Sequence, residues 1–477
     1  MDTPIPDPPA RHWLLGAALL TLAWLPTAVV GTAVVVGCLL WGPDWSPLAP
    51  LVVFWFGITG AVAREHGPLP GRAVNPDDEP ELAALVRDVA DRLGFREPLL
   101  VRIVPVVQAS LGRVRVSGVR SHVLLLGLPL LRTLTETELA SVVAHELAHE
   151  RHVSSRRAAF LRYARARLAH RLDGRFRPLA PLAAPLLRVS QPHLWQAETA
   201  ADADAARVAG AEATASALER TVRLHAAFEG LGEPWLSELA ERDAWPEDFY
   251  AALDTALADP HVARRADRTA AEDDAIDPYA TADHPPVATR LAALPALPGT
   301  GTYATTPVRL RSAAEIDRWC VARLALQDGE EGEDDVVPVR LLAMPPDELR
   351  ELDDERGTAL LFRATGTDMP AAAVNAALDT LADGSWRRLA RQLEPGLRWV
   401  PAASREQLAR TVFTAAVAGV LAEVLETSGW TPATRWMATA LTSPDGRTVD
   451  LREVIGEAVA AADPTVPRSL TAKETPA

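Results

Sequence analysis

His145-Glu146-Leu147-Ala148-His149 is the stretch that decides how this chain is interpreted. Two imidazoles four residues apart on a helix project from one face and can bind a single metal ion, with Glu146 between them. Such a string arises by chance in roughly one chain in fifty, so its surroundings have to support it. Thr135 and Glu138, just upstream, have the spacing of a capping box, and an apolar stripe follows. The sequence therefore predicts a helix of about 15 residues that carries the motif.

Length and composition limit the class of protein. A chain of 477 residues, 48% of them hydrophobic, is long enough for two or three domains with their own cores. The net charge of -15 argues against nucleic-acid binding. Cys38 and Cys320 are the only cysteines, so no disulfide framework is expected, and the soluble part fits a reducing compartment.

The amino-terminal region has the composition of a membrane hairpin. Residues 13–41 carry no charge, and a helix of this length reaches about 44 Å, more than the roughly 30 Å of a hydrocarbon core. Pro26 is expected to kink this span. Residues 48–63 form a second apolar run, which extends to a span over about 46–63.

The flanks of this hairpin predict its orientation. Trp41 and Trp45 lie at the ends of a connection without arginine or lysine, whereas Arg11, Arg64 and Arg72 lie on the other side. By the positive-inside rule, we expect a multi-pass protein of the cell membrane whose catalytic domain is cytoplasmic. The alternative is a cleaved signal peptide. It is disfavoured because no basic start precedes the first run and no clear cleavage site follows it.

The region before the motif predicts one helix and a small sheet. Residues 79–93 repeat apolar positions at helical spacing until Gly94. Strands are expected at 99–107, 113–116 and 122–126, with a turn at Ser117-Gly118, in an antiparallel sheet. In zinc peptidases an edge strand can receive the substrate backbone, which here favours residues 113–126. A purely structural sheet is an equally good alternative.

Glu198 and Asp202 are the candidates for completing a metal site. They lie four residues apart in an alanine-rich, helix-forming stretch, so both carboxylates share one face. Such a pair alone is more often a solvated helix face, but its position after the His-Glu-x-x-His helix reverses the odds. One carboxylate can bind zinc while the other orients a ligand histidine. His152 and His193 are the rival ligands.

The chain resembles the HtpX-like family of membrane zinc metalloproteases, which are gluzincins and include the CaaX prenyl proteases. The resemblance covers about residues 13–295 and rests on the hairpin, the His145 motif, the Glu198 to Asp202 string and His284-Pro285-Pro286 followed by Arg290. It implies one Zn²⁺ per chain. The residue roles that it implies are metal ligands at His145, His149 and Glu198, a general base at Glu146, support of a ligand by Asp202, and contact with the reacting carbonyl by His284 and Arg290.

Residues 151–177 depart from this family, in which further membrane spans usually separate the two zinc motifs. The segment holds nine arginines and one aspartate, with Phe160, Ala164, Leu168 and Leu172 on one helical stripe. Two interpretations are equally weighted: a basic helix on an anionic lipid surface, or a soluble helix whose arginines pair with carboxylates. The family's Asn-Ala-Phe-like string is also not evident, and residues 108–111 stand in its neighbourhood.

The carboxy-terminal third carries no catalytic motif. Residues 328–335 hold six acidic side chains and predict an exposed loop. Helices are expected at 313–326, 371–381 and 405–425, strands at 336–342 and 359–364, and a hairpin turn at 443–446. The apolar stretch 411–425 is too short to span a membrane and predicts a core helix.

Together these features predict an α+β, mostly helical protein. We expect a membrane hairpin at 1–72, a zincin-like metalloprotease domain with a small antiparallel sheet at 73–300, a regulatory or partner-binding α/β module at 301–462 and a disordered tail at 463–477. The predicted activity is hydrolysis of peptide bonds in protein substrates at the membrane, with lipid but not nucleic acid as a further partner. Two alternatives are a catalytically silent, membrane-tethered interaction protein and a metal-dependent hydrolase of a non-peptide bond.

Overall fold

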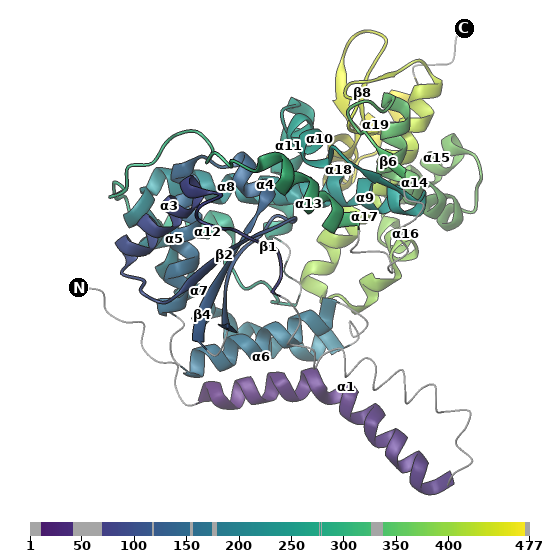
Figure 1. Cartoon of the computed structure of the whole chain (residues 1–477). Helices are drawn as coiled ribbons and strands as arrows, with labels where there is room; N and C mark the ends of the chain where they lie inside the picture. Colours follow the sequence, from purple (N-terminus) through teal and green to yellow (C-terminus); the bar gives the residue numbers. More distant parts are fainter. Residues whose placement is uncertain are drawn as a thin grey trace. The chain divides into compact units, whose positions relative to one another are not determined.

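The computed structural model describes residues 11–41, 69–116, 119–152, 156–173, 179–275, 277, 279–325 and 337–472. Over these residues the chain is mostly helical, with three small sheets (Figure 1). It divides into two compact units. Unit 1 comprises residues 1–71, 149–200 and 279–284, and unit 2 comprises residues 72–148, 201–278 and 285–477. The second predicted span, at 46–63, and the acidic run at 328–335 lie outside the described residues.

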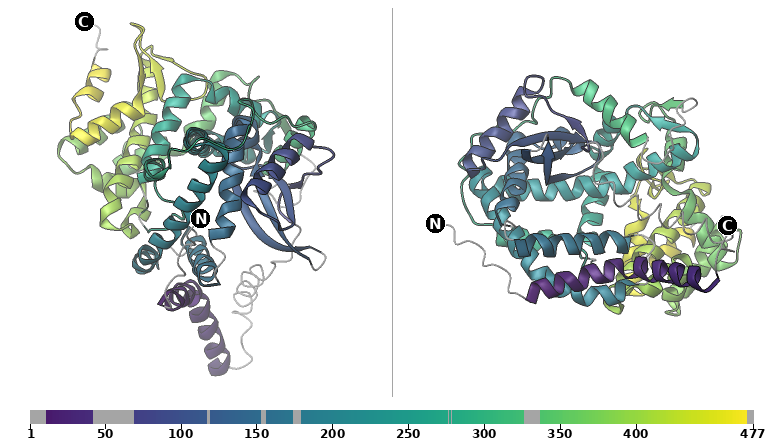
Figure 2. Two further views of the ribbon diagram at one scale, coloured as in Figure 1. Left: turned by 90° about the vertical axis from the view of Figure 1, so that its left-hand side faces the viewer. Right: turned by 60° about the horizontal axis from the view of Figure 1, so that its bottom comes forward.

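Unit 1 is built on three helices, α1 (Arg11–Trp41), α6 (Arg156–Asp173) and the first part of α7 (Ala180–Ala209). Figure 2 shows α1 running beside α6. Their shared core contains Leu19, Ala23, Leu161, Ala164, Leu168, Leu172, Ala180, Ala183 and Leu187. Three of the four residues in the predicted apolar stripe of α6, namely Ala164, Leu168 and Leu172, are therefore buried in the core of unit 1.

The predicted first apolar span is present as one helix. Pro26 lies inside α1, and Figure 1 shows that this helix changes direction part-way along its length. A proline removes one helical hydrogen bond and clashes with the preceding turn, which accounts for such a bend. The segment His12–Val29 is long and apolar enough to cross a membrane, and only 22% of it is buried.

Unit 2 begins with a four-stranded sheet whose order is β1-β2-β4-β3. The strands are β1 (Arg72–Ala73), β2 (Leu99–Val104), β3 (Ala109–Val116) and β4 (Val119–Gly127). The prediction of an antiparallel sheet is wrong for one pair, because β2 and β4 run parallel. β4 pairs with strands on both sides, and its run of one valine and three leucines (123–126) is buried or half-buried throughout, as expected for an inner strand covered on both faces.

Two helices of unit 2 match their predictions closely. α3 (Pro80–Leu93) buries the five predicted apolar positions and ends at Gly94, whose φ of 67° is the left-handed cap that glycine favours. α5 (Glu136–His152) carries the histidine motif. Its capping box forms as predicted, with the Thr135 amide donating to Glu138 Oε2 (2.8 Å) and the Glu138 amide donating to Thr135 Oγ1 (3.3 Å).

The other elements of unit 2 that lie before residue 300 are mostly helices. They are α4 (Leu128–Thr133), α8 (Ala211–Ala227), the π-helical turn η2 (Phe228–Gly232), α9 (Glu233–Glu241), β5 (Ala244–Pro246), α10 (Phe249–Leu257), α11 (Pro260–Ala275) and α12 (Val287–Ala293). Their apolar faces surround Trp235, Phe249 and Tyr250, which are almost fully buried.

The region after residue 300 is mostly helical. It contains α13 (Ala313–Ala325), β6 (Val337–Val339), α14 (Pro346–Thr365), α15 (Pro370–Ala382), α16 (Trp386–Leu393), η3 (Pro395–Trp399), α17 (Ala402–Thr427), β7 (Thr431–Pro432), β8 (Ala440–Thr442), β9 (Thr448–Asp450), α18 (Leu451–Ala461) and α19 (Thr465–Ala472). The predicted turn at 443–446 joins β8 to β9.

Two predictions for this region need correction, and the length argument behind a third changes. The strand expected at 359–364 is wrong, because these residues continue α14, and a short apolar run does not distinguish a strand from a buried helix turn. The tail expected from Asp463 contains helix α19. The stretch 411–425 belongs to the longer helix α17, and its segment Ser404–Thr427 is long enough to cross a membrane. That segment is 56% buried, and Phe413 and Val417 are fully buried, as in a core helix.

The core of unit 2 continues past residue 300. Trp235 lies with its ring centroid 5.6 Å from that of Trp436, and both side chains belong to a single hydrophobic cluster. A partly buried ion pair joins Arg265 on α11 to Asp450 (2.8 Å). Residues on both sides of the predicted domain boundary therefore stabilise the same core.

Candidate metal centre

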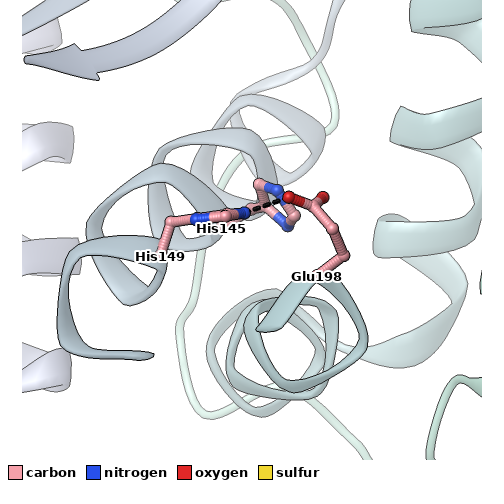
Figure 3. A group of neighbouring side chains, drawn as sticks. All are labelled: His145, His149 and Glu198. Atoms are coloured by element: carbon pink, nitrogen blue, oxygen red, sulfur yellow. Dashed lines mark hydrogen bonds and ion pairs between the residues drawn. The ribbon is translucent and has the colours of Figure 1, made fainter. Parts of the chain in front are cut away.

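Helix α5 presents its two histidines on one face. His145 and His149 are both buried, and together with Glu198 they offer ligand atoms that all lie within 4.8 Å of one another. Figure 3 shows the three side chains converging, the histidines from α5 and Glu198 from α7. Two imidazole nitrogens and one carboxylate oxygen form a donor set that suits a catalytic zinc ion, because three protein ligands leave one position for water. The structure thus brings together the three predicted ligands.

Glu198 uses both of its carboxylate oxygens. Oε1 contacts Nε2 of His149, and Oε2 lies 2.5 Å from Nδ1 of His284. The Glu198 side chain is 3% exposed, whereas that of His284 is 57% exposed. His284 therefore links the buried carboxylate of Glu198 to solvent.

Asp202, one helical turn after Glu198, holds the other histidine. Its Oδ1 lies 2.9 Å from Nδ1 of His145, and Arg290 donates to both of its oxygens, at 2.6 and 2.8 Å. Burial alone would raise the pKa of Asp202, but hydrogen bonds from Arg290 and His145 outweigh it and lower this pKa to about 2. A permanently charged carboxylate at Nδ1 keeps the proton on that nitrogen and leaves Nε2 of His145 to bind a metal.

Glu146 and Arg290, the two other predicted site residues near His145, differ in exposure and in contacts. Glu146 is partly exposed on α5, between the two histidines. Arg290 is 9% exposed, and its contacts are with Asp202 and, at 3.5 Å, with Nδ1 of His145. These contacts favour a positioning role for Arg290. Its predicted place beside the reacting carbonyl stays a prediction.

The rival ligands lie outside this cluster. The ring of His193 meets that of His12 edge to face, with centroids 4.0 Å apart, and His152 lies at the end of α5. Among the described residues, neither belongs to the group that could hold a metal ion.

Sequence reasoning missed two arginines of α6. Arg162 places Nη1 3.2 Å from Nδ1 of His149, and Arg165 is fully buried. A guanidinium only donates hydrogen bonds, so Arg162 has to turn aside when His149 binds a metal through Nε2 and carries its proton on Nδ1. The sequence could have indicated that Arg165 is buried, because it lies four residues after Leu161 and so on the apolar side of an otherwise basic helix.

A known protein family matches the part of the chain that holds the site. Residues 76–297 match the model of Peptidase family M48. Over these residues the chain is similar to the M48 family metalloproteases. The matched region runs from just before α3 to the end of α12 and contains every residue of the site described above, which confirms the resemblance stated from the motifs. No curated protein and no solved structure matches the chain.

Proposed function

We propose that this protein is a membrane-anchored zinc endopeptidase that hydrolyses peptide bonds at the cytoplasmic face, in membrane or damaged proteins. The convergence of His145, His149 and Glu198 in a helix pair that also carries Glu146 is the observation that supports it most. The substrate class rests on the resemblance alone. The site fits zinc, because its ligands and the carboxylate that orients one of them are all buried.

The proposed chemistry assigns a separate task to each side chain. Bound zinc would supply Lewis acidity, which lowers the pKa of water and polarises a peptide carbonyl. Glu146 accepts the proton of the attacking water and delivers it to the nitrogen of the leaving amine. His284 holds Glu198 through Nδ1 and turns the rest of its exposed ring toward solvent, where it can donate to the oxygen of the tetrahedral intermediate.

The sheet supports a narrower version of the predicted substrate site. Of the stretch 113–126, the part in β4 is excluded, because β4 is already paired on both sides. β3 (Ala109–Val116) lies at the edge of the sheet order, and on its outer side no strand of the described residues pairs with it. We therefore propose that a substrate adds to β3 as an extended strand.

The membrane part of the proposal is supported by α1. Its exposed side chains include Trp13, Leu14, Trp24, Leu25 and Val29, and a soluble protein rarely exposes apolar side chains in such number on one helix. At 31 residues α1 reaches about 46 Å, enough to cross a bilayer with tilt. We propose that it is one span of the predicted hairpin, with the protease on the cytoplasmic side.

Metal content and proteolysis, measured on the same preparations, test the catalytic proposal. We expect the full chain to bind one zinc ion and to cleave casein until a chelator is added. Glu146→Gln keeps the size and polarity of the side chain but removes the base, so it should keep zinc and lose about 10²- to 10⁴-fold in turnover. A zinc-loaded wild type without hydrolysis would instead favour the silent interaction protein, and turnover by Glu146→Gln at the wild-type rate would refute the mechanism.

The anchor has its own test. We expect the full chain to stay with membranes after alkaline carbonate extraction, and a fluorescent reporter that matures only in the cytoplasm to be bright when fused after Ala477. Release by carbonate would contradict a spanning α1, and a dark but full-length fusion would contradict the orientation.

A further inference from the structure

A fully buried arginine holds the segment that carries His284. Arg165, on α6 of unit 1, has 0% exposure, which is unusual for a side chain with a permanent charge. Its Nη1 donates to the Leu187 carbonyl (2.8 Å) and to Ser190 Oγ (2.8 Å), both on α7. These bonds tie α6 to the helix that carries Glu198 eleven residues after Leu187.

The remaining nitrogens of Arg165 reach the segment 279–284. Nη2 donates to the carbonyls of Ala280 and Ala282 (2.8 Å for the latter), and Nε donates to Asp283 Oδ1 (3.1 Å). A guanidinium has five N–H groups, and here each of the five has a distinct acceptor. The desolvation of the buried charge is thus offset by a complete set of hydrogen bonds.

The segment needs such a support for two reasons. Ala280 has a φ of 57°, a left-handed conformation that a residue with a Cβ adopts only when its surroundings impose it. His284 follows Asp283 directly and is itself half exposed, so little packing fixes the imidazole against Glu198. The contact of Nδ1 with Glu198 Oε2 therefore depends on where the backbone of 280–283 is held.

We propose that Arg165 is a positioning residue, which fixes the segment 279–284 so that His284 lies against the ligand carboxylate of Glu198. The proposal rests on the proposed function only for its effect on turnover. Its structural part, the order of the segment, can be measured without any activity.

Hydrogen–deuterium exchange of the full-length, zinc-loaded protein tests the structural part. We expect Arg165→Met to increase amide exchange in residues 279–284 and Arg167→Met to leave it unchanged. Arg167 is a matched control on the same helix, because its guanidinium lies over the ring of Tyr163, at 5.3 Å. Unchanged exchange in a folded Arg165→Met protein would overturn the proposal. This result would stand even if the wild type hydrolysed nothing, in which case only the proposed function fails.

Steady-state kinetics with a peptide substrate test the link to His284. We expect Arg165→Met to lower kcat by about 10- to 100-fold with little change in KM, since a displacement near 1 Å in a reacting group has effects of that size. In a His284→Ala background the same substitution should cost less than about threefold, because the two residues act as one unit. If the fold loss in kcat of the double variant equalled the product of the losses in the two single variants, the proposal would be overturned.

Two milder variants cover the case in which Arg165→Met does not fold. Arg165→Lys keeps the charge but has only three donors, and Asp283→Ala removes one acceptor whose side chain is 46% exposed. Both should increase exchange in 279–284 and lower kcat, in the same direction and to a smaller extent. Wild-type exchange and wild-type kcat in both variants would overturn the proposal.

Discussion

The two histidines of the metal helix have very different surroundings. His145 faces Asp202, which Arg290 locks with two hydrogen bonds, and all three side chains are nearly buried. His149 faces Glu198, which continues to the exposed ring of His284. The difference indicates a division of labour. We infer that the His145 side would fix the orientation of a ligand, and that the His149 side would face the substrate through the exposed ring of His284.

Removal of the Glu198 side chain should have the largest effect on zinc binding and on hydrolysis. Glu198→Ala removes a ligand and also the anchor of His284, so we expect loss of stoichiometric zinc and of all hydrolysis. The measurement is zinc content after dialysis against a weak chelator, beside casein cleavage. Glu198→Gln is the matched control, because its amide keeps the shape but is a poorer ligand. Full zinc occupancy in Glu198→Ala would remove this residue as a ligand and return His152 and His193 as candidates.

His284→Ala should separate catalysis from metal binding. If the His149 side serves the substrate, this variant keeps its zinc and loses about 10²- to 10³-fold in kcat, as other sites do when one donor to the oxyanion is removed. Zinc content and kcat are measured on the same preparation. Loss of zinc with normal turnover per bound ion would show that His284 acts only through Glu198.

Asp202→Asn, on the His145 side, should have the opposite effect to His284→Ala: it should weaken zinc binding and leave kcat nearly unchanged. The amide fits the same space but no longer balances the charge of Arg290 or keeps the proton on Nδ1 of His145. We expect zinc affinity to fall by about 10- to 100-fold, with nearly normal kcat once zinc is saturating. A fall in kcat at saturating zinc, with affinity unchanged, would contradict the comparison of the two sides.

The elements that the sequence predicted well are those with local causes. α5 follows from a capping box and a stripe within a few residues, and α3 from its apolar repeat and Gly94. The spacing of four in both motifs predicted which side chains would share a face. These arguments needed no knowledge of the fold.

The features that the sequence did not predict depend on contacts between residues that are far apart in the chain. The parallel pairing of β2 with β4 depends on which strand takes the edge, and hydropathy within a strand does not decide that. Charge made Arg165 look like part of a solvated face, although its five acceptors come from α7 and from the segment at 280–283, up to 118 residues away. The place of Arg290 on Asp202 is likewise a contact across 88 residues.

Acid should lower the free energy of unfolding by protonating Asp202, and this is the smallest of the effects predicted here. Folding lowers the pKa of Asp202 from its ordinary value of 3.8 to about 2. The carboxylate therefore stabilises the metal-free protein fully above about pH 4, and this contribution of about 2 kcal/mol is lost as the pH falls toward 2. Asp202→Asn lacks it at every pH. Urea unfolding, followed by tryptophan fluorescence, should show a stability gap between wild type and variant that narrows from pH 5 to pH 2, and a constant gap would refute the charged Asp202–Arg290 pair.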